Sequence, residues 1–216
     1  MEKIALVLFF IVTGVHLYAS LKKDVKLRAV SKPFILLTLL AFYCLSADPV
    51  SVTVVLALVF SWLGDVLLIP KGNKWFTAGG ISFMISHFFF VITYARLTDP
   101  DKINRAAMVV LPLIFAVATV VIFRMLRPYL PKALFWPMLL YLLINGCMNC
   151  FAWFRSMSSP GMAAVITAVG ALLFYVSDVT LFFVRFNEDS RLKTHFPVML
   201  TYSLGEFLIV LGLVLN

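Results

Sequence analysis

Charged residues are scarce in this chain of 216 residues, at 13% of the total, whereas 62% of the residues are hydrophobic. Soluble domains carry about 25% charged residues, and one buried core could not absorb so large an apolar excess. The polar residues gather in short clusters between long apolar runs, a pattern typical of membrane proteins with several spans. Together with the mean hydropathy of +1.02, this predicts an all-α fold, with residues 1–216 forming a single transmembrane helical domain.

Histidine and cysteine are also rare, with three of each. Cys44, Cys147 and Cys150 all lie within apolar runs, which favours small buried residues over a disulfide framework. A zinc hydrolase needs three or more ligands at helical spacing, and the sequence contains no HxxxH or HExxH motif. A GxSxG elbow, a P-loop and a GxGxxG motif are likewise absent from the sequence. We therefore expect neither a metal nor a cofactor.

Eight apolar segments are expected to span the membrane, since most are close to the ~20 residues that cross the hydrocarbon. The first lacks the basic start and cleavage site of a signal peptide and is interpreted as a span. Only Asp48 and Pro49 separate the short second segment from the third, which predicts a tight helical hairpin. The segments are Ile4–Ser20, Pro33–Ala47, Val50–Pro70, Trp75–Leu97, Ala106–Met125, Ala133–Phe154, Gly161–Val184 and Phe196–Leu215.

The net charge of +8 comes mainly from lysine and arginine in alternate loops. The positive-inside rule therefore places the odd-numbered loops in the cytoplasm and both termini outside. A basic chain of this class faces anionic lipid, and we expect no nucleic-acid partner. The odd loops carry Lys22, Lys23, Lys26, Arg28, Lys32, Lys71, Lys74, Arg124, Arg127, Lys132, Arg185, Arg191 and Lys193, and the opposite side carries Lys3, Arg96, Lys102, Arg105 and Arg155.

Two aspartates, Asp65 and Asp178, lie inside apolar segments, where an ionisable side chain costs at least ~2.5 kcal/mol and therefore needs a reason. Each follows a small residue and precedes Val, any residue and Leu. Both come shortly before the cytoplasmic end of a segment, the third and the seventh. The predicted topology makes these two helices parallel and places the two carboxyl groups at one depth.

Other polar residues are expected at compatible depths, which predicts a cavity that opens toward the inner leaflet. Pairs four residues apart share one helix face. Each also has a structural interpretation: the Asp and Asn side chains could simply bond a neighbouring helix, and Lys32 could snorkel or contact a phosphate. These residues are His16, Lys32 at the start of the second segment, His87, the pair Asn145 and Asn149, and the pair Tyr202 and Glu206.

Two carboxyl groups in an apolar site can hold different protonation states, so that one serves as general acid and the other as general base. Such a pair suits a hydrolysis that passes through an oxocarbenium-like state. An adjacent Ser86 and His87 is a weaker catalytic candidate, because neighbouring residues on a helix face about 100° apart. The chemistry thus centres on Asp65 and Asp178.

Several segments together resemble the YhhN-like lysoplasmalogenase family over essentially the whole chain. They are Ser61–Asp65, Ser177–Asp178, Lys32–Pro33, and the run from Phe76 and Gly79 through Ser82 and Phe83 to His87. The resemblance implies hydrolysis of the vinyl-ether bond of a lysophospholipid, giving a fatty aldehyde and glycerophosphocholine or glycerophosphoethanolamine.

The resemblance also implies roles for residues. Asp65 and Asp178 would divide the acid and base functions, and His87 and Glu206 would orient water or tune the pair. Lys32 and neighbouring basic residues would hold the phosphate. The family pattern leads us to expect Gln at position 206, where this chain has Glu.

Two other classes of function remain open at this stage. Membrane aspartates in similar contexts on parallel helices could belong to a proton- or cation-coupled transporter. A purely structural or lipid-sensing protein would leave the matched aspartates unexplained. The compact loops and the lack of sorting tails suit a bacterial inner membrane.

Overall fold

The computed structural model describes residues 1–187 and 194–216, and within these ranges it contains eight α-helices and no β-strand. Short 3-10 turns at 100–102, 127–129 and 132–134 precede the fifth and sixth helices. The all-α fold predicted from composition is therefore confirmed. The helices are α1 (Glu2–Leu21), α2 (Val25–Ser46), α3 (Val52–Leu67), α4 (Asn73–Arg96), α5 (Arg105–Leu126), α6 (Phe135–Ser158), α7 (Met162–Phe186) and α8 (Phe196–Val214).

Seven of these helices are long and apolar enough to cross a membrane, and α3 is a shorter apolar helix of 16 residues. The chain is an integral membrane protein with several spans. At 1.5 Å per residue α3 covers about 24 Å, less than the ~30 Å of hydrocarbon. Asp65 lies only two residues before the end of α3, so the short helix leaves this carboxyl group close to one end of the bundle.

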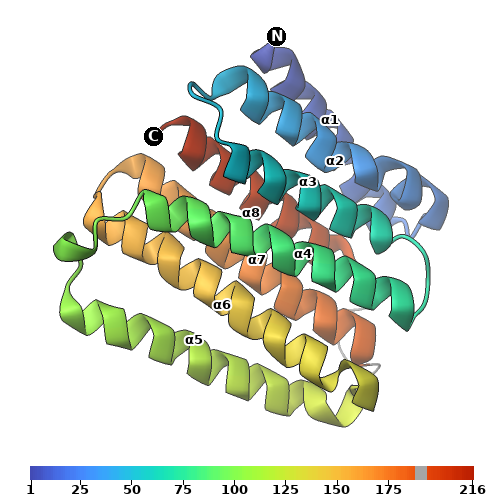
Figure 1. Ribbon diagram of the computed structural model, residues 1–216. Helices are drawn as coiled ribbons and strands as arrows, with labels where there is room; N and C mark the ends of the chain where they lie inside the picture. The colour runs from blue at the N-terminus through green and yellow to red at the C-terminus, as the bar shows by residue number, and fades with distance from the viewer. Residues whose placement is uncertain (188–193) are drawn as a thin grey trace.

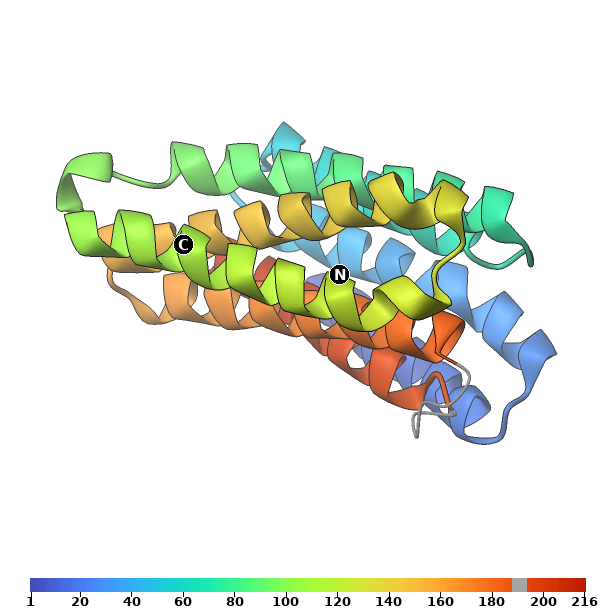
Figure 2. The same ribbon diagram turned by 90° about the horizontal axis from the view of Figure 1, so that it is seen from below.

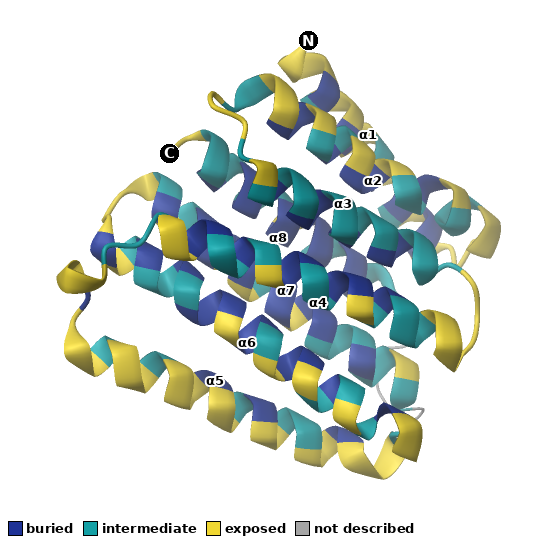
Figure 3. Cartoon of the chain, viewed as in Figure 1, coloured by how far each residue is buried: buried dark blue, intermediate teal, exposed yellow. Residues whose placement is uncertain are grey.

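The helices form one antiparallel bundle in which sequence neighbours pack in pairs (Figure 1). Helices α7 and α8 lie behind α3, α4 and α6 in this view, α1 and α2 form one margin, and α5 lies against α6 at the other (Figures 1 and 2). Buried residues concentrate on the central helices (Figure 3). Only 11% of the span that contains α5 is buried, against 50% for α6, α7 and α8, so α5 faces the lipid on most sides.

Two glycines bring the backbones of α7 and α8 into direct contact. A Cβ atom on Gly170 would lie 2.6 Å from the backbone nitrogen of Ile209, and one on Gly205 would lie 2.8 Å from that of Phe174. No larger residue fits at either position without moving the backbone. This close approach holds the middle of α8, from Gly205 to Ile209, against α7.

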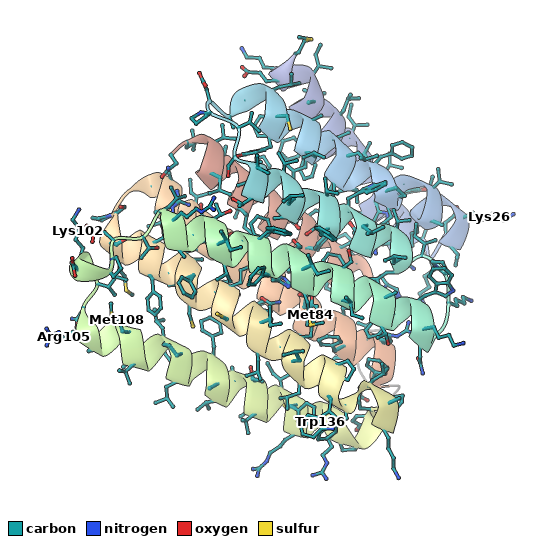
Figure 4. All side chains as sticks on the ribbon, in the orientation of Figure 1. Lys26, Met84, Lys102, Arg105, Met108 and Trp136 are labelled. Atoms are coloured by element: carbon teal, nitrogen blue, oxygen red, sulfur yellow. The ribbon has the colours of Figure 1, made fainter. Side chains whose placement is uncertain are left out.

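The C-terminal ends of α1, α3, α5 and α7 all lie at one end of the bundle, which we call the basic end (right in Figure 1). Lys26 lies at this end, whereas Lys102 and Arg105 lie at the other (Figure 4). The basic end is the one that the charge bias assigns to the cytoplasm. That orientation stays a prediction, and Arg191 and Lys193, which contribute to it, fall outside the described residues.

The second helix is longer than the predicted segment 33–47. It begins at Val25, because the Asp24 carboxylate caps its start by accepting 3.0 Å hydrogen bonds from the backbone N–H groups of Lys26 and Leu27. Pro33 lies inside the helix and does not start it. The prediction that Lys32 opens the span is therefore wrong. Lys32 was assigned to the preceding loop because it is charged, whereas the residue lies two turns inside α2.

Arg155 was predicted to lie in a loop on the side opposite the basic end; the side is as predicted, but the loop assignment is wrong. It belongs to α6 and is fully buried. Its guanidinium group donates hydrogen bonds to the Thr167 hydroxyl at 2.8 Å, the Gly212 carbonyl at 3.3 Å and the Asn216 side-chain oxygen at 2.7 Å. Arg155 thus joins α6 to α7 and to the C-terminal part of α8, on the side of the bundle away from the basic end.

Candidate active site

A cavity of about 650 Å³ opens at the basic end and contains both aspartates in its wall. Asp65 reaches it from α3 and Asp178 from α7, and the two side chains are almost fully buried. The remaining wall comes from α1, α2, α4, α8 and the connections at the basic end. The structure therefore brings the two predicted carboxyl groups to one cavity, although they are far apart in the sequence.

Asp65 is held by a cation and a phenol. The Lys32 ammonium lies 3.1 Å from Asp65 Oδ1, and the Tyr202 hydroxyl donates a 2.8 Å hydrogen bond to Oδ2. Both carboxyl oxygens are therefore occupied, and the positive charge of Lys32 stabilises the ionised form of Asp65. The ammonium predicted to contact a phosphate instead points at this carboxylate.

Asp178 has a different environment, made of neutral groups. The Tyr141 hydroxyl and the Asn145 amide donate hydrogen bonds of 2.5 and 2.7 Å to the same oxygen, Oδ2. His87 Nε2 lies 4.0 Å from that oxygen, and no Lys or Arg among the described residues pairs with Asp178. Its second oxygen, Oδ1, accepts no hydrogen bond from residues 1–187 or 194–216, so it is available to a molecule in the cavity.

Three residues of α6 form a polar stripe that holds Asp178. Tyr141, Asn145 and Asn149 follow one another at intervals of four and therefore share one helix face. The Asn149 amide donates to the Asn145 side-chain oxygen at 3.1 Å, which turns the Asn145 amide nitrogen toward Asp178. Sequence reasoning found the two asparagines but missed Tyr141, which the same spacing could have indicated.

A series of aromatic contacts connects the two tyrosines that hold the carboxyl groups. Tyr202 packs edge-on against Phe174 with ring centroids 5.3 Å apart, Phe174 against His87 at 4.9 Å, and His87 against Tyr141 at 5.4 Å. The chain of rings runs from the phenol on Asp65 to the phenol on Asp178. These contacts keep both phenols in place.

The other predicted site residues are buried around this centre. Ser61 shares a 2.8 Å hydrogen bond with Ser86 that joins α3 to α4, and Ser177 donates to the Val198 carbonyl at 2.9 Å, joining α7 to α8. His87 and Glu206 are fully buried; no described residue forms a hydrogen bond with the ring nitrogens of His87, and the Ser61 hydroxyl lies beside the Glu206 carboxyl group. The serines thus position helices, whereas His87 lies beside the Asp178 carboxyl group.

Positive groups surround the mouth of the cavity. Arg28, Lys71 and Arg185 line it together with His195, and the buried Arg28 Nε has no hydrogen-bond partner in the described chain. Partial burial, together with the charges of Arg28, Lys32 and Arg185, lowers the pKa of His195 to about 4. The positive charges of Arg28, Lys71 and Arg185 make the mouth electropositive, and such a mouth attracts anions. Sequence reasoning gave His195 no role.

A sequence model described as the YhhN family matches residues 27–213. The chain belongs to the YhhN family. The matched region contains every residue that contacts Asp65 or Asp178 in this YhhN protein, from Lys32 to Tyr202. A comparison with curated proteins found no match, and neither did a comparison with solved structures.

Proposed function

We propose that this YhhN protein is a membrane hydrolase that cleaves the vinyl-ether bond of lysoplasmalogens. The observation that carries the proposal is the unequal environment of two carboxyl groups at one cavity. Asp65 has a cation partner and Asp178 has only neutral donors. A carboxyl group without a cation in an apolar site favours its protonated form, whereas one paired with lysine favours its ionised form. The site thus offers an acid and a base together.

In the proposed reaction Asp178 is the acid. Protonated on Oδ1, it gives its proton to the outer carbon of the vinyl ether, carbon 2 of the chain. The C=C electron pair forms the new C–H bond and leaves an oxocarbenium ion centred on carbon 1. The nearby carboxylates stabilise this cation, because its positive charge is present only after the proton transfer.

Asp65 is the base in the second half of the reaction. It accepts a proton from water as the water oxygen bonds to carbon 1, and a hemiacetal forms. The bond between carbon 1 and the glycerol oxygen then breaks. The glycerol oxygen takes the proton held by Asp65, and the hemiacetal hydroxyl returns a proton to Asp178. Both groups regain their starting forms, and the products are a fatty aldehyde and a glycerophospho-alcohol.

The mouth of the cavity fits the polar half of such a substrate. We assign the phosphate to Arg28 and Arg185, with His195 beside them, since guanidinium groups bind phosphate oxygens well. The unpartnered Nε of Arg28 supports this assignment. In this assignment Lys32 does not bind the phosphate, and it affects the reaction only through its ion pair with Asp65. The cavity volume of about 650 Å³ lies within the range of small-molecule sites.

The geometry favours an enzyme over the proton- or cation-coupled transporter that the sequence leaves open. The cavity wall consists of residues from the basic half of the bundle. At the opposite end the buried Arg155 ties α6 to α7 and α8. A transporter needs polar access from both sides, whereas a lipid hydrolase needs only one.

A panel of three lysophospholipids with one headgroup and one chain length tests the proposal. They differ only in carrying an alkenyl ether, an alkyl ether or an acyl ester at position 1. We expect the purified protein to release aldehyde from the alkenyl lipid and to leave the other two intact, because only the vinyl ether can accept a proton on carbon. Mass spectrometry measures all products.

Cleavage of the acyl lipid at a similar rate would contradict the proposal and indicate an esterase. Uptake of a solute into proteoliposomes, with no turnover of any lipid in detergent, would instead support the transporter.

A further inference from the structure

A second, apolar pocket lies between α4 and α6, and Asp178 and Tyr141 form its inner end. Its volume is about 50 Å³, and it lies on the side of α4 that faces α6 and α7. Met84 lies on this side of α4 (Figure 4). The pocket is lined by Leu68, Phe76, Thr77, Gly80, Ile81, Phe83, Met84, Leu130, Leu134, Pro137, Met138, Tyr141, Asp178, Leu181, Phe182 and Phe186.

We propose that this pocket binds the first part of the aliphatic chain of the substrate, so that the chain extends from the site sideways into the bilayer between α4 and α6. This inference rests on the proposed function. It adds the positions of the headgroup and of the hydrocarbon chain in the bound lipid. The occupant is the hydrocarbon chain of a single-chain phospholipid.

The two cavities adjoin and share part of their walls. Phe83, Asp178 and Leu181 belong to the walls of both, as do Leu68 and Phe76. One cavity carries the positive groups of the mouth, and the other is almost entirely apolar. An amphipathic molecule that fills both must therefore have its polar–apolar junction at Asp178.

The reacting bond of the proposed substrate lies at that junction. The vinyl ether consists of the glycerol oxygen and the first two chain carbons, so the headgroup is on one side of it and the remaining chain is on the other. With phosphate at Arg28 and the chain beside α4, carbon 2 falls next to the free Oδ1 of Asp178. The two pockets thus orient the lipid for protonation at carbon.

Gly80 is the position at which this pocket can be closed. A Cβ atom on Gly80 would meet nothing within 4 Å, although the residue lines the pocket. The neighbouring Gly79 differs, since its Cβ would lie 2.9 Å from the Leu68 side chain. A Cβ atom at Gly80 therefore fits without a clash, and we expect a larger side chain there to extend into the pocket.

The test compares Gly80→Leu with wild type on two alkenyl substrates that share a headgroup, one with a long chain and one with a chain of two or three carbons. We expect kcat/KM for the long chain to fall by roughly 10-fold or more, the scale on which apolar pockets discriminate. Turnover of the short substrate should stay within about twofold, because it does not reach past Gly80. Gly14→Leu is the matched control, since Gly14 on α1 also has open space around its Cβ and lies away from both pockets.

An equal loss on both substrates, or no loss on either, would overturn the inference while leaving the proposed function intact. No turnover of either substrate by wild type would instead contradict the proposed function. A measurement without any variant uses a non-cleavable alkyl lysolipid with a photoreactive group near the start of its chain. Cross-links should fall on 76–84 or 134–141, and cross-links confined to α1 or α5 would exclude this pocket.

Discussion

Asp178→Asn is expected to lower turnover of an alkenyl lysophospholipid by roughly 10²–10⁴-fold, the usual contribution of a general acid. Its thermal stability should remain close to that of wild type. The Asn side-chain oxygen can accept the hydrogen bonds from Tyr141 and Asn145 that Oδ2 accepts now. The amide nitrogen then stands where protonated Oδ1 stands, and its N–H protons are too weakly acidic to be transferred to carbon. Aldehyde release and the midpoint of thermal unfolding are measured on the same preparation.

Asp101→Asn is the matched control, because Asp101 is an exposed acid at the opposite end of the bundle. It should keep full activity and stability. Near wild-type turnover by a folded Asp178→Asn protein would remove Asp178 from the reaction and, with it, the proposed mechanism.

Lys32→Met is expected to reduce both stability and activity, because it leaves the Asp65 carboxylate buried without its cation. Breaking a buried ion pair by removing one partner costs about 3 kcal/mol or more. The double variant Lys32→Met with Asp65→Asn removes both charges and should recover most of that stability. It should nevertheless remain inactive, because no base is left to activate water. Thermal unfolding and aldehyde release together separate the two effects.

The pair formed by Lys102 and Asp99 provides the control. Its atoms are 3.2 Å apart, nearly as close as those of Lys32 and Asp65, but both side chains are exposed. Lys102→Met should therefore change stability little. If the double variant at 32 and 65 were as unstable as Lys32→Met alone, Lys32 would act through packing and not through the charge of Asp65.

The helices could be predicted from sequence because length and hydropathy alone define a span. Most predicted boundaries lie within four residues of the observed ones. The start of α2 was missed because hydropathy assigns a segment with Lys26, Arg28 and Lys32 to a loop. In the structure this segment is helical, since Asp24 caps its start and the cavity accommodates charged side chains. Burial of Arg155 was missed for a similar reason, since its partners come from α7, α8 and Asn216 beyond the end of α8.

The candidate site was predictable where a charge stood alone in an apolar run. Asp65 and Asp178 stood out in this way, and topology placed them at one end. The difference between them could not be read from sequence, because it comes from residues on other helices: Lys32 and Tyr202 for Asp65, and Tyr141 and Asn145 for Asp178. A tyrosine in an apolar run looks like packing until its partner is known. The catalytic roles of the two aspartates stay predictions.

The central claim is that this site places a proton on carbon 2 of a vinyl ether. Turnover of an alkenyl lysophospholipid in D₂O, with the aldehyde reduced at once to the alcohol and analysed by mass spectrometry, tests it directly. We expect one deuterium on carbon 2 of the released chain with wild-type protein and no product with Asp178→Asn. A chain released without deuterium on carbon 2 would contradict protonation at carbon and the account built on it.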